Sequence, residues 1–167
     1  MTAIDLRQYP FVTAALNDPL TVKVLGLVTP TGEPHLAVKS SLKMSDSGGL
    51  KYDEIIETSR TNSLMLRALW FFEKVAVSLI TTDGLGWLLK GRPERVVISG
   101  QEFRRHYEIA RSNNPQHGLG AVWFIEIETV TETTLEKRRQ EEEESHPLLI
   151  HLDRLLVNRP DGQVVKK

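Results

Sequence analysis

Residues 35–44 read HLAVKSSLKM, and the alternation of their side chains is the clearest fold signal in the chain. Apolar side chains stand at Leu36, Val38, Leu42 and Met44, with polar or small residues between them. A period of two residues places successive side chains on opposite faces of an extended backbone. The stretch therefore predicts one continuous β-strand with an apolar face and a polar face.

A second strand precedes this one, and the two form a predicted hairpin. Residues 22–28 are apolar, and the Pro-Thr-Gly-Glu-Pro segment at 30–34 has the composition of a turn. Four further segments have strand alternation or β-branched composition, at residues 50–57, 75–82, 87–98 and 121–130. Gly91 and Pro93 predict a bend or bulge inside the segment 87–98.

Helical patterns are short and few between these strands. They cover residues 10–16, 62–69 and 101–111. Strands joined mostly by turns favour an antiparallel sheet over a parallel sheet with alternating helices. The predicted fold is mainly β with α: a six-stranded antiparallel split β-barrel with short helices and a C-terminal helical extension.

The composition changes after residue 132. We therefore predict a barrel over residues 1–132 and an extension of the same domain over residues 133–167. Residues 135–144 are almost wholly charged and predict a solvated helix. A second predicted helix starts at Pro147 and carries leucines at helical spacing. This leucine stripe would pack either on its own barrel or on a second subunit.

Composition limits the possible functions. The chain has 167 residues, 21 basic against 22 acidic side chains and a net charge of −1, so no field favours nucleic acid or an anionic membrane. The absence of cysteine excludes disulfides, thiolate nucleophiles and Cys-ligated metals. The five histidines show no metal-ligand spacing, so no metal site is predicted. With no targeting segment and no apolar run long enough to span a bilayer, we expect a soluble, cytoplasmic protein.

The segment 57–63, Glu-Thr-Ser-Arg-Thr-Asn-Ser, separates the third predicted strand from the helix that follows. An arginine among hydroxyls and an amide, just before a helix opens, can gather donors and a favourable dipole around one phosphate. The alternative is that Thr58, Ser59 and Thr61 only cap the helix. The residues of the predicted phosphate site are Thr58, Ser59, Arg60, Thr61 and Asn62.

The order of these motifs resembles the FMN-binding split-barrel superfamily, which includes the pyridoxamine 5′-phosphate oxidases and the small FMN-binding proteins of anaerobic bacteria. The likeness covers residues 10–130. It rests on Gly-x-Pro-His-Leu at 32–36, Lys-Ser-Ser at 39–41, Thr-Ser-Arg-Thr at 58–61, Val-Ala-Val-Ser-Leu at 75–79 and Gly-Trp-Leu-Leu-Lys-Gly at 86–91. The resemblance implies a homodimer with FMN at the subunit interface and its phosphate held after the third strand.

Residue by residue, the resemblance places Ser59, Arg60 and Thr61 on the FMN phosphate. It places Lys39, Ser40 and Ser41 along the polar edge of the flavin ring. A cation there would favour the anionic reduced flavin, although Lys39 is equally explained as an ordinary solvated lysine. Trp87 and Trp123 are large aromatics that could line the flavin site or the dimer interface, or could simply pack in the core.

This chain also departs from the oxidases. It lacks their Arg-x-Val-Leu-Leu-Lys strand and their C-terminal substrate motif, and Thr61 stands where they often carry a second cation, which argues against vitamin B6 oxidation. The expected function is an FMN-dependent oxidoreductase or flavin reductase acting on a small substrate or electron donor, with no catalytic side chain. The alternatives are a non-catalytic FMN-binding or electron-transfer protein and a haem-binding split barrel.

Overall fold

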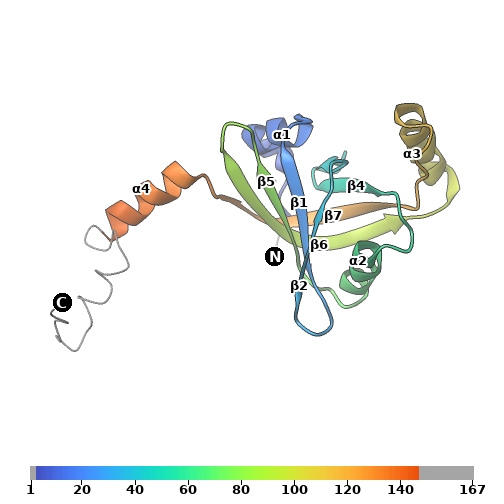
Figure 1. Ribbon diagram of the computed structural model, residues 1–167, viewed down its shortest axis with the longest axis horizontal. Coiled ribbons are helices and arrows are strands. Elements are labelled where there is room, and N and C mark those ends of the chain that lie inside the picture. The colour runs from blue at the N-terminus through green and yellow to red at the C-terminus, as the bar shows by residue number, and fades with distance from the viewer. Residues whose placement is uncertain (1–2, 147–167) are drawn as a thin grey trace. The chain divides into compact units, whose positions relative to one another are not determined.

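The computed structural model describes residues 3–146, and its contacts divide the chain into two units, residues 1–132 and 133–167. Figure 1 shows the first unit as a curled sheet with helices at its margins. Its elements, in chain order, are η1 (Leu6–Gln8), α1 (Pro10–Asn17), β1 (Val22–Val28), β2 (Pro34–Val38), β3 (Lys43–Met44), β4 (Leu50–Glu54), α2 (Arg60–Trp70), β5 (Val75–Ile80), β6 (Gly86–Val97), α3 (Gly100–Asn113) and β7 (Ala121–Glu132).

All seven strands belong to one antiparallel sheet with the order β2-β1-β5-β6-β7-β4-β3. The predicted antiparallel, mainly β architecture is confirmed, but the described residues form seven strands and not six. The extra strand arises because the predicted strand at residues 35–44 is divided into β2 and β3, which lie at the two opposite edges of the sheet.

A turn at residues 39–42 divides the predicted strand, and burial explains why. Leu36 and Val38 on β2 are 71% and 70% exposed, whereas Leu42 is fully buried. One straight strand would hold all three side chains on the same face, so the backbone must turn for Leu42 to reach the core. The Leu42 amide donates to the Lys39 carbonyl at 3.0 Å and closes this turn.

The main core lies inside the curled sheet, beneath α1 and α2. Fully buried side chains include Leu16, Tyr52, Met65 and Trp123. Lys23 on β1 also points inward, and its ammonium donates to the carbonyls of Leu16 at 2.5 Å and Leu42 at 3.1 Å. Burial lowers the pKa of Lys23. Two carbonyls thus satisfy a buried cation and tie α1 and the 39–42 turn to β1.

The predicted bend in the long strand is confirmed in β6. Its register against β7 shifts between Lys90 and Gly91 and again between Pro93 and Arg95. A side chain at Gly91 would collide with the carbonyl of Glu126 on β7. The glycine is therefore required by the close approach of the two strands.

The second unit contains α4 (Leu135–Ser145), where the sequence predicts a charged helix at 135–144. Its side chains are exposed, and pairs such as Arg139–Glu143, four residues apart, link successive turns. The predicted leucine-striped helix from Pro147 lies outside the described residues. Within residues 3–146, no helix is long and apolar enough to cross a lipid bilayer.

Candidate phosphate-binding site

The predicted phosphate site lies at the junction of β4 and α2. β4 ends at Glu54, three residues earlier than predicted, and α2 begins at Arg60, two residues earlier than predicted. Ser59 is the N-cap, and its hydroxyl accepts from the Asn62 amide at 3.0 Å. The capping role expected for Ser59 is therefore confirmed.

Asn62 has a structural role. Its side-chain oxygen accepts from the indole N–H of Trp123 at 2.8 Å, and its side-chain Nδ2 donates to the carbonyl of Glu57 at 2.7 Å. Both Asn62 and Trp123 are buried. The first turn of α2 is thereby fastened to the core strand β7, which fixes the position of the helix N-terminus.

Thr61 and Thr58 have different surroundings. Thr61 is buried, and its hydroxyl shares a 3.0 Å hydrogen bond with His35 Nε2 on β2. This contact brings the β1–β2 hairpin to the start of α2. Thr58 is exposed and does not cap the helix. Of the predicted hydroxyls, Ser59 and Thr61 are thus engaged by the protein itself.

Arg60 is a cation at this junction. Its side chain is exposed and makes no ion pair with any residue in the described range 3–146. The backbone N–H groups of Arg60 and Thr61 lie in the first turn of α2, where an α-helix offers no internal acceptor. A guanidinium, two open N–H groups and the positive end of a helix dipole together fit a phosphate group.

Lys39 belongs to the same corner of the molecule, but its charge is already paired. Its ammonium lies 2.6 Å from Glu54 Oε2 and 5.2 Å from the ring centroid of Tyr52. The side chains of Lys39 and Glu54 are only 14% and 3% exposed. Glu54 therefore largely neutralises the cation that the sequence assigns to the flavin ring.

The two remaining members of the Lys-Ser-Ser motif sit in the 39–42 turn and not in a strand. The Ser41 hydroxyl bridges this turn to β4, because it accepts from the Asp53 amide and donates to the Asp53 carbonyl, both at 3.1 Å. Ser40 is exposed. Residues 39–41 and 58–62 are thus brought to the same end of β4, although they are separated in sequence.

Trp87 is not part of this cluster. It is buried at the start of β6 and, with Phe11 and Ala15 of α1 and the 81–85 turn, lines a separate cavity of about 450 Å³. Sequence reasoning missed Glu54 and His35, which contact the predicted site residues directly. The signal for Glu54 was its place on the inward face of β4, two residues after the buried Tyr52.

Within residues 3–146, no group of three or more histidine, aspartate or glutamate side chains is placed to hold a metal ion.

No protein-family model matches the chain, and no curated protein sequence matches it. Solved structures do match. An FMN-binding protein from Syntrophomonas wolfei has a TM-score of 0.64 at 15% identity, with 78% of this chain and 89% of that chain covered. HupZ from Group A Streptococcus has a TM-score of 0.62 at 16% identity, with 75% and 94% covered.

A pyridoxamine 5′-phosphate oxidase-like protein from Listeria innocua is also similar. It has a TM-score of 0.57 at 16% identity, and the match covers 76% of this chain and 98% of that chain. At these identities the likeness shows the shared fold and does not transfer an activity.

Proposed function

We propose that this chain, which has the fold of the FMN-binding split-barrel superfamily, is an FMN-binding flavoprotein. The observation that carries the proposal is Arg60 at the open N-terminus of α2, which makes no ion pair within residues 3–146 and lies where the resemblance expects the phosphate. The neighbouring contacts of Ser59 and Asn62 support it, because they hold this helix end in place without consuming Arg60.

In this proposal the chain itself binds and orients the cofactor. Arg60 and the first N–H groups of α2 hold the phosphate. Residues 39–41, tied to β4 through Glu54 and Asp53, lie along the polar edge of the ring. When bound, FMN would supply hydride-transfer chemistry. Because Glu54 neutralises Lys39, this chain offers the ring a weaker positive field than an unpaired lysine would.

The binding experiment compares FMN with riboflavin, which has the same ring system but no phosphate. Flavin fluorescence is titrated with wild-type protein, with Arg60→Ala and with the matched control Arg104→Ala, whose side chain is 79% exposed on α3. We expect Arg60→Ala to weaken FMN binding by ~1.5–3 kcal/mol, about 10-fold to 150-fold, and to leave riboflavin binding unchanged. Equal affinity of wild type and Arg60→Ala for FMN would refute the phosphate assignment.

We further propose that the flavoprotein acts as an oxidoreductase on a small substrate. The test measures the oxidation of NADH or NADPH by the FMN-loaded protein with stopped-flow absorbance. Turnover that disappears with Arg60→Ala supports the enzyme. Flavin binding without turnover by either nucleotide, and without reoxidation by added electron acceptors, supports a non-catalytic flavin-binding protein.

We also propose that the flavoprotein is a homodimer. One face of the β2-β1-β5 portion of the sheet carries exposed apolar side chains, which are 47–71% accessible: Val22, Val28, Leu36, Val38 and Ile80. Contiguous apolar surface of this kind is typical of an interface. Light scattering should give a dimer for the wild type and for the control Ile98→Lys, and a monomer for Leu36→Lys. A monomeric wild type would refute the dimer.

A further inference from the structure

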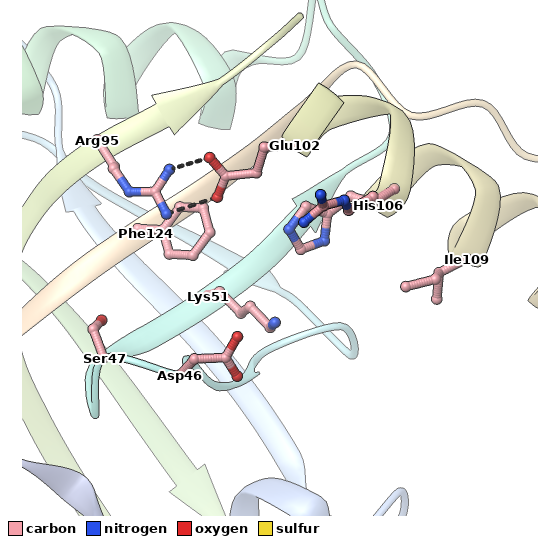
Figure 2. Close-up of a pocket in the computed structure, with 9 residues that line it drawn as sticks. Asp46, Ser47, Lys51, Arg95, Glu102, His106, Ile109 and Phe124 are labelled. Atoms are coloured by element: carbon pink, nitrogen blue, oxygen red, sulfur yellow. Dashed lines mark hydrogen bonds and ion pairs between the residues drawn. The ribbon is translucent and has the colours of Figure 1, made fainter. Parts of the chain in front are cut away.

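A second cavity, of about 570 Å³, lies on the face of β4 and β7 that points away from the main core (Figure 2). Four parts of the chain build it: the β3–β4 turn with Asp46, β4 with Lys51, β6 with Arg95 and α3 with His106, over a floor formed by Phe124 of β7. This volume is within the usual range for small-molecule sites. The cavity shares no lining residue with the junction of β4 and α2.

One wall of the cavity is fixed in place. Arg95 donates two hydrogen bonds to Glu102, at 3.0 and 2.8 Å, and its guanidinium carbon lies 3.7 Å from the centroid of the Phe124 ring. Figure 2 shows this pair above the aromatic floor. The charges of Arg95 and Glu102 cancel, and the Arg95 side chain remains 43% exposed. A planar guanidinium of this kind can stack against a flat ring.

The remaining charges in and around the cavity are mainly positive. Lys51 and Arg105 make no ion pair with any residue in the described range. His106 lies edge-on to Phe124, and in Figure 2 Lys51 is drawn between it and Asp46. Burial, followed by the charge of Lys51, lowers the pKa of His106, so that the imidazole is neutral near pH 7.

The acidic groups do not balance these cations. Asp46 lines the cavity and Asp53 faces His106, but Lys43 also faces His106 and adds to Lys51 and Arg105. Among residues 3–146, Lys43, Lys51 and Arg105 make no ion pair, and they stand against the carboxylates of Asp46 and Asp53. An anion that enters the cavity would meet a net positive charge and the N–H donors of Lys51, Arg105 and His106.

The helix that closes the cavity contributes little to the core. α3 has 14 residues and an apolar side, yet none of its side chains is buried. Phe103 packs on the small second cluster of Leu119, Val122 and Phe124, while Ile109 remains 54% exposed and lines the cavity. A long helix that buries none of its side chains is explained if its role is to line a binding site.

We propose that this cavity is a second ligand site, which takes a small organic anion with a flat ring, such as an aryl phosphate or an aromatic carboxylate. The anionic group is held by Lys51, Arg105 and His106, and the ring stacks on the Arg95 guanidinium. This inference does not depend on FMN binding at Arg60.

The experiment titrates phenyl phosphate into the full-length protein while the imidazole resonances of His106 and the backbone amides are followed by NMR. Benzyl alcohol and inorganic phosphate test the ring and the charge separately. We expect saturable shifts at His106 and Ile109 for phenyl phosphate, and binding at least about tenfold weaker for each comparator.

Variants then assign the charges. Lys51→Gln and Arg105→Gln should each weaken phenyl phosphate binding about tenfold. The matched control Arg104→Gln, on the neighbouring exposed position of α3, should leave it unchanged. The proposal is overturned if the shifts do not saturate, if Arg104→Gln weakens binding equally, or if Arg60→Ala abolishes the shifts at His106. It is equally overturned if Arg105→Gln only changes the oligomeric state.

Discussion

The ion pair between Lys39 and Glu54 gives the sharpest test of how this corner of the molecule is built. The perturbation is Lys39→Met, which keeps most of the length of the side chain and removes its charge. Coulomb's law gives an attraction of about 6 kcal/mol for unit charges at the observed 2.6 Å and an effective dielectric constant of about 20. Desolvation of both groups offsets most of this, so the net value of the intact pair is small.

Removing only the lysine has a different cost. Glu54 is 3% exposed, so its carboxylate would stay buried without a compensating charge. Breaking such a pair from one side costs about 3–5 kcal/mol. For a protein of this size that corresponds to a fall in melting temperature of about 6–20 °C. The contact of the Lys39 ammonium with the Tyr52 ring, at 5.2 Å, is lost in the same substitution.

The assay is urea unfolding followed by tryptophan fluorescence, for Lys39→Met, Glu54→Gln, the double variant and the control Lys43→Met. Lys43 is exposed and makes no ion pair within the described residues, so its substitution should change stability by less than about 0.5 kcal/mol. The double variant should be more stable than the sum of the single changes predicts, by at least about 1 kcal/mol. Additive single changes, or a loss below about 1 kcal/mol for Lys39→Met, would contradict this account of the pair.

Two other substitutions test the structure around the site. Asn62→Ala should lower the free energy of unfolding by about 1–3 kcal/mol, because the buried indole N–H of Trp123 loses its acceptor. The control Ser63→Ala, on the same helix, should lower it far less, and chemical denaturation measures both. Gly91→Ala should lower the free energy of unfolding by about 1–3 kcal/mol or more, because the added methyl group would collide with the β7 backbone. Gly118→Ala, where a methyl group meets open space, is the thermal-melting control, and equal melting temperatures would disprove the packing argument.

Local pattern predicts most of the strands and helices of this fold. The segments around β1, β5, β6 and β7 carry enough alternation or β-branched residues to be placed closely. The alternation at residues 35–44 is misleading, because it continues through a turn while the buried face changes from one side of the chain to the other. Only the packing of Leu42 reveals that change, and packing depends on distant residues such as Lys23.

The candidate site is likewise predictable only in its local part. The run of hydroxyls and arginine at 58–62 is local, so the start of a helix and an exposed arginine could be anticipated. The long-range contacts could not be anticipated, because they depend on which elements become neighbours in the fold: Glu54 with Lys39, His35 with Thr61 and Trp123 with Asn62. The cavity beside α3 was missed because four separate segments line it.

The turn at residues 39–42 joins the two edges of an otherwise open sheet. In a closed barrel, hydrogen bonds along every strand share the task of keeping the ring shut. Here that task falls on a short stretch of backbone, which is held by the Lys39–Glu54 ion pair, the Ser41 bridge to β4 and the Lys23–Leu42 hydrogen bond. Lengthening the chain at residues 30–33 would alter only the tip of a hairpin, whereas one inserted residue at 39–42 would change the curvature of the whole sheet. Tolerance to insertion should therefore differ sharply between two loops that are only a few residues apart.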